Sequence, residues 1–175
     1  MTKRFGIVTG VLAGVCTLWF AVTIVAHAQS QAKTTGEKGT VMHATGPFEV
    51  KMTPQKPDNP TEEAANIARM TGDKQWHGDL EGTSKVVMLA TAPDAKGSGV
   101  YVALERVTCT LKGRSGTFLL HHTGIMNRGV PELSISTAPD SGTGQLTGIS
   151  GKMTIIIAAD KKHSYEFEYT LPDAQ

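Results

Sequence analysis

The sequence contains only two cysteines, Cys16 and Cys109, among 175 residues. Cys16 lies in an apolar N-terminal stretch that we expect to be removed, which leaves Cys109 alone in the mature chain. An intramolecular disulfide is therefore excluded there, and stability must come from a packed core. Cys109 itself lies in a predicted strand, where it is expected to be a small buried hydrophobe.

The chain also has little excess charge of either sign, with 17 basic and 16 acidic residues. Without Lys3 and Arg4 of the N-terminal stretch, 15 basic residues remain against the same 16 acidic ones, a formal charge of −1. Nucleic acid as a partner, and attraction of the mature chain to an anionic membrane, have no electrostatic basis here.

Metal and nucleophile motifs are lacking as well. No two histidines of the mature chain have the spacing that would put both on one face of a strand or helix, and there is no cysteine pair, so we expect no metal site and no cofactor. The segment Ser141-Gly142-Thr143-Gly144 neither follows a buried parallel strand nor opens a helix. It is therefore no phosphate loop and no nucleophile elbow.

Residues 1–28 have the pattern of a secretory signal peptide. Lys3 and Arg4 precede an uncharged apolar run from 6 to 25, and Ala26-His27-Ala28 offers small residues at the cleavage site. We expect cleavage near Ala28, a periplasmic or secreted protein, and a polar flexible leader at 29–40. The alternative is an uncleaved anchor, because the apolar run approaches the ~20 residues that span a bilayer.

Residues 41–172 predict one all-β domain. Two β-rich runs between Gly99 and Met126 flank a turn signal at 112–116, and residues 164–171 alternate between polar and apolar. The only helix signal, Thr61 to Met70, allows a turn or two before a strand that begins near Ala68. Many short strands without a long helix predict an antiparallel β-barrel of about eight strands. Neither face of the central hairpin is cleanly polar, so we expect the outer wall to meet a partner or a loop.

Several segments in this order resemble one bacterial family, domain of unknown function 3224, from about Val41 to Leu171. They are GPFEVK at 46–51, GDLEGTS at 78–84, YVALER at 101–106, GRSGTF at 113–118, SGTG at 141–144 and HSYEFEY at 163–169. The resemblance implies a barrel of the allene oxide cyclase-like type, shared with plant dirigent proteins and often found in oligomers. It implies no established reaction, and a shared fold does not carry catalytic residues across.

Strand parity selects two candidate catalytic residues. Glu105 shares a face with Tyr101, and a carboxyl that lines the barrel would have a raised pKa and could act as an acid or base. The alternative is a structural ion pair or hydrogen bond, with Arg114 or a backbone group as partner. His122 is expected to point inward and His121 outward, which makes His122 either a general base or ligand contact, or a hydrogen-bonded core residue.

The leading hypothesis is an exported barrel that binds a small hydrophobic ligand, because an eight-stranded barrel can hold one small molecule. An isomerase or cyclase that acts on an apolar small molecule, with Glu105 or His122 moving a proton, is the second hypothesis. A purely structural homo-oligomer with filled barrels is the third, so the sequence leaves open whether the protein is an enzyme. The residues expected to contact a ligand are Trp76, Tyr101, Glu105, Phe118, His122 and Tyr165.

Overall fold

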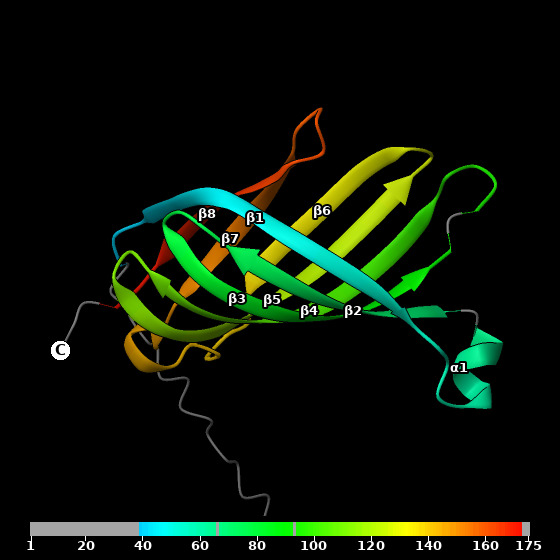
Figure 1. Cartoon of the computed structure of the whole chain (residues 1–175), viewed down its shortest axis with the longest axis horizontal. Coiled ribbons are helices and arrows are strands. Elements are labelled where there is room, and N and C mark those ends of the chain that lie inside the picture. Colours follow the sequence, from blue (N-terminus) through cyan, green and yellow to red (C-terminus); the bar gives the residue numbers. More distant parts are fainter. Residues whose placement is uncertain (1–38, 66, 93, 173–175) are drawn as a thin grey trace, which may run out of the picture. The chain divides into compact units, whose positions relative to one another are not determined.

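Antiparallel strands follow one another in sequence order around a closed barrel, and the last strand pairs with the first (Figure 1). The computed structural model describes residues 39–65, 67–92 and 94–172, so the predicted signal peptide and most of the leader lie outside the described residues. The prediction of an eight-stranded antiparallel barrel is confirmed. The strands are β1 (Met42–Gln55), β2 (Ile67–Trp76), β3 (Leu80–Thr91), β4 (Gly99–Leu111), β5 (Arg114–Asn127), β6 (Val130–Thr137), β7 (Ser150–Ile157) and β8 (His163–Thr170).

The central hairpin forms as the sequence predicts, with a tighter turn. Leu111 pairs with Arg114, so the turn consists of Lys112 and Gly113 alone, at φ 45° and 84°. Two successive residues with positive φ form the type of turn whose twist matches that of the flanking strands. The β5–β6 hairpin repeats this solution with Arg128 and Gly129, at φ 50° and 83°.

Alternation along the strands separates the interior of the barrel from its outer wall. In β4, Val107 is buried whereas Leu104 is exposed, and in β5 the orientation of the two histidines is as predicted, with His122 inside and His121 outside. The interior is packed with aromatic rings, among them Trp76, whose ring lies 4.8 Å from Phe48 between centroids. Other close ring pairs are Trp76–Tyr165, Phe118–Phe167 and Phe167–Tyr169.

One end of the barrel is closed by the connection between β6 and β7, which contains the short 3₁₀ helix η1 (Gly144–Leu146). This connection runs along β5 where β6 has ended. Its side chains take the place of a strand: Thr143 Oγ1 accepts a hydrogen bond from Thr117 N (3.1 Å), and Ser141 Oγ accepts one from Leu119 N (3.0 Å). Because Leu146 is fully buried in the core, the connection also plugs this end.

The one α-helix among the described residues, α1 (Pro60–Ala65), lies outside the barrel between β1 and β2 (Figure 1). It has the length that the sequence predicts, but Asn59 caps it: its Oδ1 accepts a hydrogen bond from Glu62 N at 3.0 Å. β2 begins at Ile67, close to the expected start. Among the described residues, no helix is long and apolar enough to cross a membrane.

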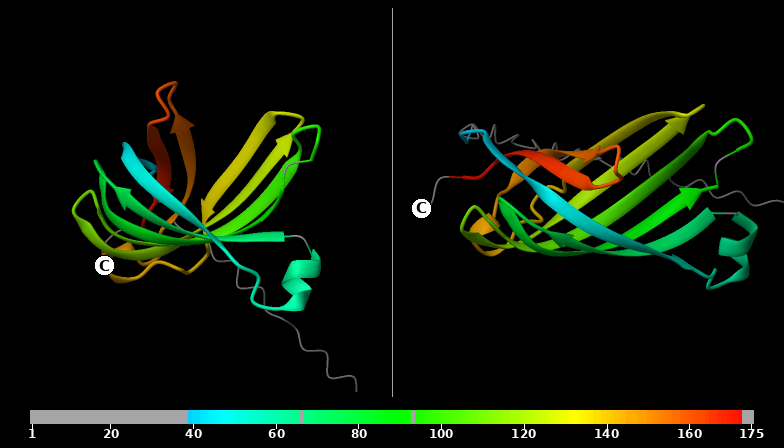
Figure 2. Two further views of the ribbon diagram at one scale, coloured as in Figure 1. Left: turned by 45° about the vertical axis from the view of Figure 1, so that its right-hand side comes forward. Right: turned by 45° about the horizontal axis from the view of Figure 1, so that its top comes forward.

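The barrel is unevenly closed. β1 and β8 pair over seven positions, from Met42↔Tyr169 to Phe48↔His163, but β6 and β7 share only the pair Ser136↔Lys152. Figure 2 shows the two strands diverging from this seam. The rest of β6 pairs with β5 alone, so the barrel has an open end opposite the end plugged by Leu146.

Candidate functional site

A buried polar network crosses the barrel interior between β2 and β5. Glu105 is fully buried, and its Oε2 lies 2.8 Å from Lys74 Nζ. Its Oε1 accepts a hydrogen bond from Ser84 Oγ, which in turn accepts one from Trp76 Nε1 at 3.0 Å. The Lys74 ammonium also lies over the rings of Phe48 and Trp76, 5.0 and 4.8 Å from their centroids. Both oxygens of Glu105, the Ser84 hydroxyl and Trp76 Nε1 therefore have partners, which a buried charge requires.

Strand register assembles these residues from four neighbouring strands. Lys74 and Trp76 are two residues apart in β2 and point the same way, and Lys74 lies opposite Ser84 in β3. Glu105 in β4 follows the same inward parity, and Ala103, two residues before it, lies opposite His122 in β5. Lys74 and Ser84 are absent from the sequence-based candidates. The signal that would have found Lys74 is its parity with Trp76.

The electrostatics of Glu105 differ from the prediction. Burial does oppose its ionisation, but contacts with His122, Lys74 and Ser84 outweigh burial and hold the pKa of Glu105 below its ordinary value. Glu105 is therefore ionised at neutral pH and is no proton donor there. The prediction that Arg114 pairs with Glu105 is wrong as well, since the cation that neutralises Glu105 is Lys74.

His122 is the second basic group beside this carboxylate. Its Nε2 lies 3.1 Å from Glu105 Oε2, but off the direction that a good hydrogen bond requires. His122 keeps a small exposed fraction of 7%, whereas Glu105 has none. His122 can therefore bind or orient a polar group of a ligand. Glu105, which is fully buried, can affect that group only through His122.

A recess of about 260 Å³ lies at the unplugged end of the barrel, and its walls are almost entirely apolar. Tyr101 lies between this recess and the polar network: it lines the recess, and burial together with the charge of Glu105 raises its pKa. The Tyr101 ring rests on Gly124, where a Cβ atom would lie 2.0 Å from a ring carbon. The lining residues with inward parity are Ala90, Gly99, Tyr101, Gly124, Met126, Pro131 and Leu133, and Thr91, Val100, Ile125 and Glu132 complete the lining.

The six residues expected to contact a ligand all point into the barrel, but they do not form one site. Trp76, Phe118 and Tyr165 are fully buried and belong to the packed aromatic core. The Tyr165 hydroxyl accepts a hydrogen bond from Leu80 N (2.9 Å) and donates one to His77 O (3.1 Å), so it anchors the β2–β3 turn. Tyr101, Glu105 and His122 form the group between the core and the recess.

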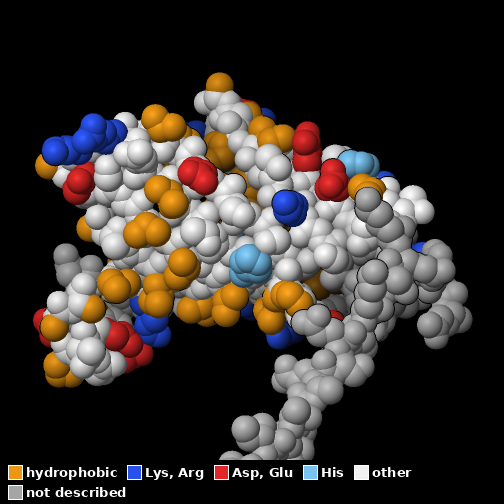
Figure 3. All heavy atoms as spheres, turned by 180° about the vertical axis from the view of Figure 1, so that it is seen from behind, with side chains coloured by type: hydrophobic (Ala, Val, Ile, Leu, Met, Phe, Trp, Pro, Cys, Tyr) orange, Lys and Arg blue, Asp and Glu red, His pale blue; other side chains and the backbone are white. Residues whose placement is uncertain are grey.

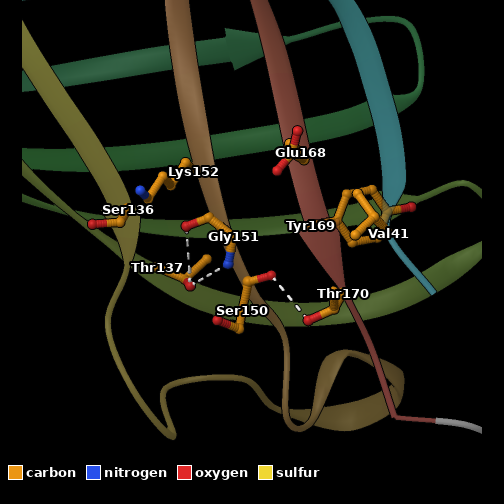
Figure 4. A pocket seen from close by; sticks show the side chains of 9 residues that line it. All are labelled: Val41, Ser136, Thr137, Ser150, Gly151, Lys152, Glu168, Tyr169 and Thr170. Carbon is orange, nitrogen blue, oxygen red and sulfur yellow. Dashed lines mark hydrogen bonds between the residues drawn. The ribbon is translucent and has the colours of Figure 1, made fainter. Parts of the chain in front are cut away.

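A second hollow, of about 320 Å³, lies over the seam between β6 and β7 (Figure 4). There, Thr137 Oγ1 accepts a hydrogen bond from Gly151 N at 2.8 Å. This side-chain bond adds a second link between β6 and β7 beside the Ser136↔Lys152 pair. Lys152 and Glu168 face each other on the neighbouring strands. The hollow is open and its lining is mixed, with Val41 and Tyr169 beside the polar side chains, and we assign its hydroxyl groups to sealing the seam.

Cys109 is buried, as predicted. Burial raises the pKa of its thiol to about 12, which keeps it protonated and unreactive. The described residues hold no cluster of three or more histidine, cysteine or acidic side chains that could bind a metal ion.

Comparison with known proteins places the chain in one family. The model of a protein family of unknown function, DUF3224, matches residues 44–169. A crystal structure of a protein with unknown function from the DUF3224 family of Shewanella oneidensis MR-1 is similar, with 39% sequence identity and a TM-score of 0.69. The match covers 77% of this chain and all of that one. No curated protein matches the chain.

Proposed function

We propose that this chain, which belongs to the DUF3224 family of proteins of unknown function, binds a small and largely apolar molecule at the open end of its barrel. One observation carries the proposal: an apolar recess of about 260 Å³ ends at Tyr101, behind which lie Glu105 and His122. Apolar walls with a few converging polar groups are what small-molecule sites have in common. The recess is slightly below the usual ~300–1,000 Å³ of such sites, which favours a small ligand.

The polar groups favour a ligand that carries one hydrogen-bonding group. A neutral hydroxyl or carbonyl of the ligand could form hydrogen bonds with Tyr101 and His122. An anionic group would be repelled by the negative charge of Glu105. This electrostatic arrangement supports binding over acid catalysis, because Glu105 is already ionised and paired with Lys74. Proton transfer through His122 remains the second candidate, supported by its 3.1 Å approach to Glu105.

An uncharged fluorescent probe, N-phenyl-1-naphthylamine, tests the proposal. We expect its fluorescence to rise on binding and to saturate at one probe per chain. Leu133→Glu introduces a charge into the lining and should weaken binding at least about tenfold, since transfer of an apolar probe beside a carboxylate costs over 1.4 kcal/mol. The matched control is Val130→Glu, in the same strand but outside the recess. Equal binding by both variants would contradict the proposal.

Native mass spectrometry of the purified protein, with a solvent extract, would identify a molecule that stays bound. We also propose that the protein is exported, on the pattern of residues 1–28. The intact mass of the protein from a periplasmic fraction checks this: a chain that begins at Gln29 supports export, and a chain that retains residues 1–28 contradicts cleavage.

A further inference from the structure

The outer wall of the barrel carries an apolar patch over β3, β4 and β5. Its members all have outward parity and are about half exposed, from 42% for Ile125 to 58% for Leu104. Register makes the patch continuous, because Val87 lies opposite Leu104 and Leu89 opposite Val102. Val100 lies opposite Ile125 in the same way. The outer-wall patch consists of Val87, Leu89, Val100, Val102, Leu104 and Ile125.

No described segment covers this patch. The helix α1 lies between β1 and β2, and the β6–β7 connection runs beside β5 at the plugged end. Figure 3 shows hydrophobic side chains exposed on one face of the molecule, with a nearly continuous band along its lower margin. Single exposed hydrophobic residues need no explanation, but a contiguous set on one sheet face does.

The size of the patch fits a protein interface. Six half-exposed aliphatic side chains expose on the order of 500 Å², which is near the upper end for a monomer and over half of the about 800 Å² that each partner buries in a standard interface. Antiparallel sheets also pack well face to face, with their side chains interdigitating.

The charges around the patch indicate which partner it fits. Arg106 lies on the outer face of β4 beyond Leu104, toward the plugged end, and Glu132 lies opposite Ile125, toward the open end. Neither has an ion-pair partner among residues 39–65, 67–92 and 94–172. A two-fold axis in the plane of the patch, perpendicular to the line from Arg106 to Glu132 and through its midpoint, exchanges the positions of these two residues. Arg106 of each copy then faces Glu132 of the other.

We propose that the outer-wall patch on β3, β4 and β5 is the interface of a two-fold symmetric dimer of this chain, with Arg106 and Glu132 paired across it. Apolar burial supplies the affinity, and the two symmetric ion pairs fix the orientation. Val100, Ile125 and Glu132 also line the recess, so the interface adjoins the proposed ligand site along one rim. The inner-face lining residues Met126 and Leu133 lie outside the patch.

Sedimentation velocity of the purified chain over a range of concentrations tests the dimer. We expect the wild-type mass to be that of two chains, and Leu104→Lys to weaken association at least about tenfold, because a buried interface anchor is replaced by a charge. Ile156→Lys is the matched control: it places the same charge at an exposed aliphatic residue on the outer face of β7, outside the patch. Circular dichroism checks that both variants keep their β structure.

A charge exchange gives a second readout that loss of folding cannot imitate. Arg106→Glu and Glu132→Arg should each weaken the dimer, whereas the double variant should restore it, because the pair is only reversed. A wild-type chain that stays monomeric at every concentration overturns the proposal. So does a dimer that Leu104→Lys leaves intact, or a patch that binds lipid vesicles while the chain remains monomeric.

Discussion

At the scale of single residues, the stability of the barrel interior depends on how the fully buried carboxylate of Glu105 is neutralised. Lys74 supplies the opposite charge to Glu105, and Ser84 satisfies the second oxygen. A buried ion pair of this kind contributes little net stability compared with apolar residues of the same size, but the loss of one member leaves the other charge buried and unpaired. The pair is therefore a point where single substitutions have large effects.

We predict that Glu105→Gln lowers the free energy of unfolding by about 3 kcal/mol, because the Lys74 ammonium loses its counter-ion in a buried site. Lys74→Met should have a similar effect for the converse reason. The double variant should lose less than the sum of the two, since it buries no unpaired charge. Urea unfolding at pH 7 measures all four proteins, and additive losses would contradict the ion pair.

The pH dependence of unfolding separates this charge effect from loss of packing. The pKa of Glu105 is lowered in the folded state, so the unfolded state binds more protons over the window between the two pKa values. The stabilisation by ionised Glu105 is thus present above the ordinary glutamate pKa of about 4.3 and is lost as the pH falls below it. Glu105→Gln should remove that part of the acid dependence, and an unchanged pH slope would contradict this explanation.

At the scale of elements, parity and turn chemistry were sufficient to predict most of the barrel from the sequence. The hairpin around Lys112 and Gly113, the inward His122 and the final strand follow from alternation and positive φ, which are local properties. The partner of Glu105 does not, because Lys74 comes from a strand two positions away around the barrel. The position of the recess was also beyond prediction, since it is formed by the ends of four strands, β3, β4, β5 and β6.

The β6–β7 connection shows how an irregular element can be held as firmly as a strand. It approaches β5 so closely that a Cβ atom on Gly116 would lie 2.1 Å from the backbone oxygen of Thr143. We predict that Gly116→Ala displaces the connection and lowers the free energy of unfolding by about 1–3 kcal/mol, the usual cost of overpacking. Urea unfolding provides the measurement.

Gly113→Ala is the control for this substitution, because it adds the same methyl group where no atom lies within 4 Å. Its cost comes from the positive φ of 84° alone, about 1–2 kcal/mol. Amide exchange in residues 117–119 distinguishes the two variants: it should accelerate in Gly116→Ala and stay unchanged in Gly113→Ala. Equal exchange in both would mean that the connection does not depend on this close approach.

At the scale of the whole barrel, its two ends differ in how they are filled, and the β1–β8 and β6–β7 strand pairings differ in length. Leu146 plugs one end, and the other holds the apolar recess. The β1–β8 closure extends over seven residue pairs, whereas the β6–β7 closure has one. The part of β6 that has no partner in β7 includes Pro131, Glu132 and Leu133, which line the recess, and the regions that open most easily are commonly those used for binding.

We therefore predict that local opening begins at the β6–β7 seam. Backbone amides in 130–135 of β6 and 154–157 of β7 have a strand on one side only, so they should exchange with solvent at least about tenfold faster than those in 102–108 of β4, which lie between two partners. Hydrogen exchange followed by mass spectrometry measures this, and residues 42–48 in the β1–β8 closure serve as the protected reference. If both closures are protected equally, the barrel opens elsewhere or only by global unfolding. A ligand that slows exchange at 130–135 and leaves 42–48 unchanged would locate its site at the recess that β6 helps to line.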